Sequence, residues 1–222
     1  EFGKKSTCII SRKADLVNQM ILEIELPALQ SGVSWINGIG HHIIKTVEIE
    51  IGGQVIDSHT GEFLDIYSEL TTPTSKKDGY HHMIGRHNFF TKSSQEGAIK
   101  LYIPLRFWFC KNIGSSLPLV AMQYSEIRIT LNLRPFNECW YSGTNMATTP
   151  SVKKITNAVL YCDYIYLDVQ ERKKFATAPV HNYLIEQVQK SIGNPVLENS
   201  PSALVDFHFN HPVKEILWIY QH

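Results

Sequence analysis

Apolar side chains recur at every second position through much of this chain, and that period limits its possible folds more than any other feature. The clearest run places four aliphatic residues at alternate positions, namely Ile127, Ile129, Leu131 and Leu133. Successive side chains of a β-strand point to opposite faces of the sheet, so this run has one buried and one solvated face. Similar short runs at residues 7–11, 20–26, 47–51, 54–58 and 99–103 predict a chain built mainly of strands.

The predicted strands are numerous enough for a sandwich of two sheets. Gly52 and Gly53 stand between two of the runs and are typical of a hairpin turn. Residues 158–168 are apolar on both faces, which predicts a strand in the centre of a sheet, and residues 183–189 predict a shorter strand. About eight strands then precede residue 195, and that number is typical of an antiparallel jelly-roll sandwich.

Two short helices are predicted between the strands. The first follows Thr60, a residue type that caps helices, and has apolar residues at helical spacing: Phe63, Ile66, Tyr67 and Leu70. The second follows a D-x-x-E capping box formed by Asp168 and Glu171. So few helices among so many strands exclude a Rossmann fold and a TIM barrel. The long segments 72–97 and 136–152 are predicted to be loops that carry contacts either with other subunits or at the exterior.

Composition narrows the class of protein further. The chain has 222 residues and is 43% hydrophobic, which is enough for the core of a large all-β domain. Its 21 basic residues balance 21 acidic ones, so charge gives no reason to expect binding to nucleic acid or to an anionic membrane. Apolar runs are interrupted by charge or proline, so neither a transmembrane helix nor a signal peptide is predicted. Four cysteines without zinc-site spacing predict reduced thiols in a cytoplasmic product.

Three consecutive aromatic residues, Phe107, Trp108 and Phe109, are the first candidates for packing or interface contacts. An extended chain would point Trp108 away from its two neighbours, so burial of all three requires apolar surroundings on both sides. Two interpretations remain open: Pro104 ends a strand and the rings plug the end of the sandwich, or part of the cluster meets a neighbouring domain or subunit. Three further candidates of the same kind are Trp140, Tyr141 and Trp218.

Catalytic and metal-binding patterns are weak in this sequence. Histidines gather at residues 81, 82 and 87, but an adjacent pair such as His41 and His42 points apart in an extended chain, and solvated loop histidines are the simpler interpretation. A metal-dependent jelly-roll enzyme using His81 or His87 is therefore ranked last. A carbohydrate-binding β-sandwich with Trp35, Trp140 and Tyr141 stacked on sugars is the second hypothesis. We predict no catalytic, cofactor-binding or metal-binding residues.

The C-terminal segment differs from what precedes it. Residues 194–201 are typical of a linker, after which Val205, Phe207 and Phe209 alternate and residues 216–220 are wholly apolar. This pattern faintly repeats the start of the chain. We therefore predict a first jelly-roll domain at residues 1–195, and a linker with the opening strands of a truncated second jelly roll at residues 196–222. The chain is interpreted as a piece of a longer protein.

Several segments, in order, resemble the major capsid proteins of nucleocytoplasmic large DNA viruses, of the iridovirus and asfarvirus kind. They include Phe2-Gly-Lys-Lys-Ser-Thr, Ala14-Asp-Leu, Leu101-Tyr-Ile-Pro-Leu, Phe107-Trp-Phe-Cys, Leu117-Pro-Leu, Glu171-Arg-Lys-Lys-Phe-Ala, Tyr183-Leu-Ile-Glu-Gln-Val-Gln and Asn210-His-Pro-Val-Lys-Glu-Ile-Leu-Trp. None is decisive alone, but together they span nearly the whole chain.

The resemblance implies a double jelly roll of which three copies form a pseudo-hexagonal capsomer. Such capsomers tile an icosahedral shell over an internal membrane. The partners implied are two further copies in a homotrimer, neighbouring capsomers and minor capsid proteins, with no direct contact to nucleic acid and with the membrane nearby but not entered. The implied location is the virion, assembled in the host cytoplasm. The family supplies no catalytic residue, and we expect no enzymatic activity.

Overall fold

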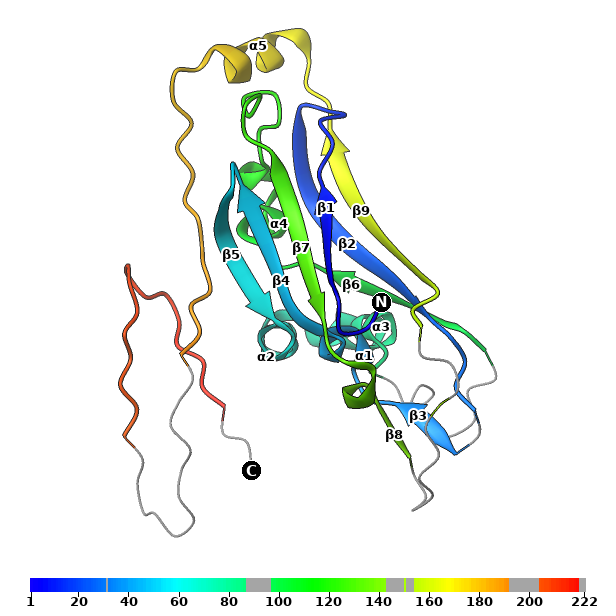
Figure 1. Ribbon diagram of the computed structural model, residues 1–222. Coiled ribbons are helices and arrows are strands. Elements are labelled where there is room, and N and C mark those ends of the chain that lie inside the picture. The colour runs from blue at the N-terminus through cyan, green and yellow to red at the C-terminus, as the bar shows by residue number, and fades with distance from the viewer. Residues whose placement is uncertain (31, 87–96, 143–149, 151–153, 192–203, 220–222) are drawn as a thin grey trace. The chain divides into compact units, whose positions relative to one another are not determined.

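The computed structural model describes residues 1–30, 32–86, 97–142, 150, 154–191 and 204–219 (Figure 1). The chain divides into two compact units, Glu1–Gln187 and Val188–His222. All helices and strands of the described residues lie in the first unit. The expected domain boundary at residues 195 and 196 falls outside the described residues.

A four-stranded antiparallel sheet forms one layer of the first unit. Its strands are β1 (Lys5–Ile9), β7 (Ile127–Leu133), β4 (Ile44–Ile51) and β5 (Gln54–Thr60), in the order β1-β7-β4-β5. The alternation predicted for β7 is confirmed, because all four of its aliphatic side chains are buried. Gly52 and Gly53 join β4 to β5 with φ of 60° and 86°, a left-handed backbone that glycine adopts without steric cost.

A three-stranded antiparallel sheet forms the second layer. Its order is β6-β2-β9, with β6 at Ile99–Pro104, β2 at Leu16–Leu26 and β9 at Asn157–Ile165. The prediction that residues 158–168 form a central strand is wrong, since β9 pairs with β2 alone among the described strands and β2 occupies the centre. The outer face of β9 includes Tyr161, which is exposed, since a tyrosine side chain has a polar hydroxyl and can lie at a surface.

A third, two-stranded sheet pairs β3 (Val33–Trp35) with β8 (Trp140–Ser142). Neither strand was predicted, because three residues are too few for alternation to be recognised. Strand β8 and the 3₁₀ helix η2 (Phe136–Glu138) both lie in a segment predicted to be loop.

Both predicted helices are confirmed, with their caps. Helix α2 (Gly61–Thr71) begins after Thr60, whose hydroxyl accepts a hydrogen bond from the Phe63 amide at 3.3 Å. Helix α5 (Val169–Thr177) begins after Asp168, whose carboxylate accepts from the amides of Gln170 and Glu171, each at 2.8 Å. The other helical segments, none of them predicted, are α1 (Ile39–His42), α3 (Thr74–Ile84), α4 (Trp108–Lys111) and the 3₁₀ helix η1 (Ile113–Ser115).

Two strands predicted in the C-terminal part of the chain do not form among the described residues. Residues 183–189 are extended but form no strand, although the Tyr183 hydroxyl donates to the Ser116 carbonyl at 3.0 Å within the first unit. In the second unit, no strand forms among described residues 204–219, and the end of the expected run 216–220 lies outside them. Alternating side chains make a strand only when another backbone pairs with it, and these segments find no such partner among the described residues.

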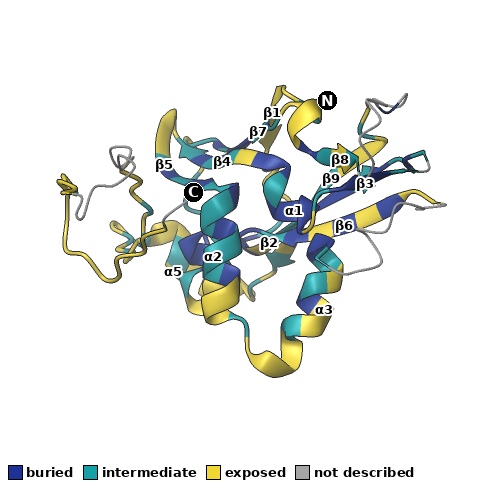
Figure 2. Cartoon of the chain, turned by 90° about the horizontal axis from the view of Figure 1, so that it is seen from below, coloured by how far each residue is buried: buried dark blue, intermediate teal, exposed yellow. Residues whose placement is uncertain are grey.

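The core lies between the two larger sheets, which face one another in Figure 1. Figure 2 shows buried residues gathered on and between these sheets, whereas the turn from α2 to α3 is exposed. The largest fully buried side chains are Trp35, Phe107, Phe109, Met20, Ile24, Leu26, Ile39, Ile43, Ile44, Ile49, Leu64 and Ile84. The sandwich is therefore a rigid support for whatever its surface carries.

Candidate interaction surfaces

The aromatic residues of α4 lie inside the domain rather than on its surface. Pro104 ends β6, and the chain then enters α4 at Trp108, as the interpretation in which Pro104 ends a strand expects. Phe107 and Phe109 are 0% exposed and Trp108 is 4% exposed. Their rings stack, with centroids 5.9 Å apart for Phe107 and Phe109, and Trp108 meets Phe109 edge-on at 5.2 Å. Of the two interpretations, internal packing accounts for these residues.

Next to this cluster lies a buried acid–base pair that the sequence did not reveal. His59 Nε2 is 2.8 Å from Asp57 Oδ2, and both side chains are buried on the inner face of β5. The His59 ring is 4.8 Å from the rings of both Phe63 and Phe107. The only sequence signal is an Asp and a His two residues apart, which share one strand face. Both side chains are buried, and the contact between them offsets part of the cost of burying two polar groups in the core.

A second aromatic cluster surrounds Trp35 and Trp140, which face each other across β3 and β8. Phe136 packs edge-on against Trp35 at 6.1 Å and lies 6.2 Å from Trp140. Trp35 is fully buried, so the hypothesis that it stacks on sugars is wrong. Trp140 is half-buried, whereas Tyr141 is 44% exposed and remains a candidate for contact with another molecule.

A polar network fixes helices α1, α2 and α3 to one another. His41 is buried, and both of its ring nitrogens have polar partners. Its Nδ1 is 3.1 Å from Asp65 Oδ1, and its Nε2 is 3.0 Å from the Tyr80 hydroxyl. A carboxylate only accepts hydrogen bonds, so Nδ1 carries the hydrogen. Arg86 donates to both carboxylate oxygens of Asp65 at 2.5 Å and also pairs with Glu69. These residues are far apart in sequence, which is why no local pattern predicted the network.

This network gives Asp65 a role in the pH dependence of stability. Burial raises the pKa of Asp65, but the hydrogen bond from His41 and the charge of Arg86 lower it by more, so the pKa lies below its ordinary value. A lowered folded-state pKa contributes stability at pH above the unfolded value of about 3.9, and that stability is lost as pH falls through the folded pKa.

We expect Asp65→Asn to lower the free energy of unfolding by about 1–2 kcal/mol at pH 7, because the amide keeps only part of the hydrogen bonding. The difference between the two proteins should shrink as pH falls below about 4, because the unfolded wild-type carboxylate is protonated there and the folded one follows at a lower pH. Urea unfolding of both proteins at several pH values between 7 and 2.5 measures this. A difference that stays constant over the whole range would contradict the assignment.

Helix α5 is anchored by a buried carboxylate in the segment before β2. Arg172 reaches Asp15 with Nε and Nη2 at 2.8 Å and 2.9 Å, and the Leu167 amide donates to the same carboxylate at 2.8 Å. The hydrogen bonds from Arg172 and then Leu167 lower the pKa of Asp15.

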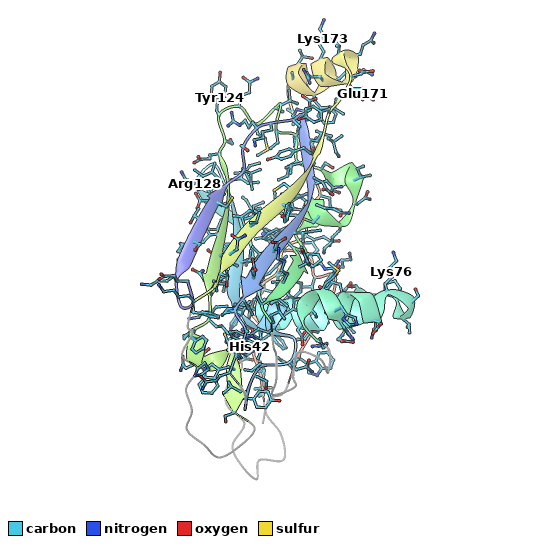
Figure 3. The ribbon with its side chains drawn as sticks, turned by 90° about the vertical axis from the view of Figure 1, so that its right-hand side faces the viewer. His42, Lys76, Tyr124, Arg128, Glu171 and Lys173 are labelled. Carbon is cyan, nitrogen blue, oxygen red and sulfur yellow. The ribbon has the colours of Figure 1, made fainter. Side chains whose placement is uncertain are left out.

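Figure 3 shows Glu171 and Lys173 projecting from α5 away from the strands, with Tyr124, which is fully exposed, at the same end. This end of the domain therefore presents both charged and aromatic side chains to other molecules.

The second unit exposes many large apolar side chains. Trp218, one of the predicted interface residues, is 81% exposed. Others in the same unit are Leu204, Val205, Phe207, Val213, Ile216, Leu217 and Ile219. Groups of exposed large apolar side chains are typical of surfaces that contact other molecules.

Neither a metal-binding cluster nor a membrane-spanning helix occurs among the described residues. Within them, no three His, Cys, Asp or Glu side chains come together in a way that would hold a metal ion. His81 instead lies 3.3 Å from Glu69, and His87 is outside the described residues. None of the helices in the described part of the chain has the length and apolar character required to cross a bilayer.

Comparison with known proteins assigns the family. Residues 1–168 match a family model described as the N-terminus of the major capsid protein. The chain belongs to the major capsid protein family. It is 40% identical over 225 residues to the major capsid protein of Pyramimonas orientalis virus, covering 98% of this chain and 52% of that protein. The major capsid protein of Phaeocystis pouchetii virus is 35% identical over 258 residues, covering 100% and 49%.

A solved structure supports the same assignment. The chain superposes on the quasi-atomic model of the PBCV-1 virus capsid with a TM-score of 0.73 and 31% identity, covering 85% of this chain and 44% of that one. The resemblance to capsid proteins of large DNA viruses is therefore confirmed, and the mostly β fold agrees with that of a viral capsid protein. The chain spans about half the length of the curated major capsid proteins it matches.

Proposed function

We propose that this chain is the N-terminal part of a structural capsid protein that works by self-association. In this proposal three copies form a pseudo-hexagonal capsomer, and capsomers tile an icosahedral shell. The observation that carries the proposal is the family match over residues 1–168. Lattices of this kind arise from heterologous contacts between rigid subunits, and a close-packed sandwich provides that rigidity.

The domain arrangement is part of the proposal. Residues 1–195 form a first, eight-stranded jelly roll, and residues 196–222 form a linker and the opening strands of a second one. The exposed apolar side chains of residues 204–219, Trp218 foremost, support this assignment. A strand with apolar side chains on both faces is stable only between other layers, and the remainder of a second domain supplies them.

The partners proposed are two further copies, neighbouring capsomers and minor capsid proteins. The balance of 21 basic and 21 acidic residues supports a shell that does not bind the genome directly. The family resemblance alone suggests an internal membrane nearby, which the protein does not enter. Tyr141 and the exposed end around Tyr124 are the surfaces we assign to contacts with other subunits. The protein acts in the virion after assembly in the host cytoplasm and catalyses no reaction.

Light scattering on the full-length gene product tests the proposal directly. We expect a mass three times that of the polypeptide, unchanged on dilution through the micromolar range. A monomer of constant mass would contradict self-association as capsomers. Glycan binding by that monomer, measured through quenching of tryptophan fluorescence, would then favour a carbohydrate-binding module instead.

A further inference from the structure

Positive charge is concentrated at one place on the sheet β1-β7-β4-β5, although the charge of the whole chain is balanced. A hollow of about 310 Å³ lies at the end of the sheet where β1 and β4 begin and β7 ends. Figure 1 shows these three strands side by side. Lys4, Lys5 and Lys45 line the hollow, and no Asp or Glu of the described residues belongs to its lining. Three positive charges therefore surround one small space.

The register of the strands brings these residues together. Lys5 of β1 lies opposite Asn132 of β7, and Asn132 lies opposite Thr46 of β4. Opposite residues of paired strands share one face of the sheet. In β7 this is the outer face, because the aliphatic residues that alternate with Asn132 are buried on the inner one.

A β-bulge adds Lys45 to this row. The pairing of β4 with β7 shifts between Ile44 and Thr46, so Lys45 has no opposite residue in β7. In a regular strand Lys45 and Thr46 would point to opposite faces, yet both line the hollow. A bulge can re-aim a side chain in this way, and such bulges are frequent beside functional sites.

The three lysines are not neutralised within the domain. Among the described residues they form no ion pair with a carboxylate, whereas Arg134, which directly follows β7, pairs with both Glu62 and Glu138. Like charges repel one another, so an anion that enters the hollow from outside the domain would stabilise this arrangement.

Asn132 and Thr46, both half-buried, add uncharged hydrogen-bond donors to the hollow. Asn132 Nδ2 donates to Thr46 Oγ1 at 2.6 Å. The Thr46 oxygen accepts this bond, so its own hydrogen points elsewhere, and Nδ2 has a second hydrogen to donate. The hollow thus combines positive charge with donors, which is the chemistry that recognises an oxyanion.

We propose that this hollow binds a small multivalent phosphate anion, of the class of tripolyphosphate. Lysine binds phosphate as a compact point charge, and an anion with several charged oxygens can contact all three ammonium groups at once. No arginine of the described residues lines the hollow, so it lacks the planar fork that matches the carboxylate of an acidic peptide. The site is separate from the surfaces around Tyr141 and Tyr124 assigned to contacts with other subunits.

Isothermal titration of the full-length gene product with tripolyphosphate tests the proposal. We expect saturable binding that Lys45→Gln and Lys5→Gln each weaken by at least about tenfold. Lys76→Gln is the matched control, because Lys76 is an exposed lysine of α3 outside the hollow and should leave the affinity unchanged (Figure 3). Absence of saturable binding, or equal weakening by the control variant, would overturn the proposal.

Titrations with other anions test the chemical class. Sulfate, with less charge, should bind at least about tenfold more weakly than tripolyphosphate. ATP should bind about as tightly as tripolyphosphate, because the triphosphate is the recognised group, and binding of ATP alone would overturn the proposal by placing recognition on the nucleoside. A glutamate oligopeptide that binds as tightly as tripolyphosphate would assign the hollow to an acidic peptide instead.

Thermal unfolding separates binding at this hollow from general attraction of anions. A ligand that binds only the folded state raises the Tm. Tripolyphosphate should therefore raise the Tm of the wild type and of Lys76→Gln, but not that of Lys45→Gln, whose own cooperative transition shows that it is folded. An equal rise in all three proteins would contradict the site.

Discussion

Replacing Phe107 with alanine is expected to lower the free energy of unfolding by about 3–5 kcal/mol, the range for large-to-small changes at buried aromatic positions. The ring is fully buried and is stacked against both Phe109 and His59. Its removal leaves a cavity beside the buried His59–Asp57 pair, and the cavity adds to the cost of losing the buried ring. Urea unfolding of the chain, followed by tryptophan fluorescence, gives the difference in free energy.

A surface aromatic residue provides the matched control for this prediction. Tyr124 is fully exposed, so Tyr124→Ala should change the free energy of unfolding by no more than about 0.5 kcal/mol. If Phe107→Ala cost less than about 1 kcal/mol, the aromatic cluster would not be part of the core. That result would favour the interpretation in which part of the cluster contacts a neighbouring domain or subunit.

The strands that could be predicted are those whose two faces have different surroundings. In β7 the inner face meets the core, and the outer face carries Arg128, Thr130 and Asn132, which contact polar side chains of β1 and β4. Alternation in the sequence therefore reports the structure directly. The caps of α2 and α5 were also predictable, because Thr60 and Asp168 bond to amides within three residues of themselves. Each of these predictions depends only on local geometry.

The incorrect predictions depend on what a segment packs against. Residues 107–109 are aromatic without alternation, and the sequence alone did not distinguish an extended chain from the short helix α4 that begins at Trp108. Helix α3 is polar over most of its length and buries only Tyr80 and Ile84, so it lacks the apolar stripe by which helices are recognised. Its position is set by the network of His41, Asp65 and Arg86, which no spacing in the sequence reveals.

The predicted interface residues fall into two groups, those that pack inside the domain and those that are exposed. Burial in the structure distinguishes the two groups, whereas amino-acid composition does not. Phe107, Trp108 and Phe109 stabilise the domain from within, whereas Tyr141 and Trp218 expose their side chains. An apolar residue is available to a partner only where the fold leaves it uncovered. The surfaces that a capsid protein uses for assembly therefore have to be read from exposed positions such as these.

Gly61→Ala is expected to destabilise the protein by about 2 kcal/mol or more, even though alanine is the better helix former. Gly61 is the first residue of α2, and a methyl group there meets the carbonyl oxygens of both His41 and Ile44. Both are backbone atoms of α1 and the start of β4, so they cannot rotate away as a flexible side chain would. Steric overlap with two fixed carbonyls therefore outweighs a gain in helix propensity of about 1 kcal/mol at most.

Gly79→Ala is the control that isolates this steric effect. Gly79 lies within α3, and a methyl group there meets nothing within 4 Å. This substitution should raise the free energy of unfolding by about 0.5–1 kcal/mol, because it restricts the unfolded chain and favours the helix. Urea unfolding of the two variants should thus move the midpoint in opposite directions. A midpoint for Gly61→Ala that rises together with that of Gly79→Ala would show that the contact between Gly61 and the α1–β4 backbone does not limit side-chain size at this position.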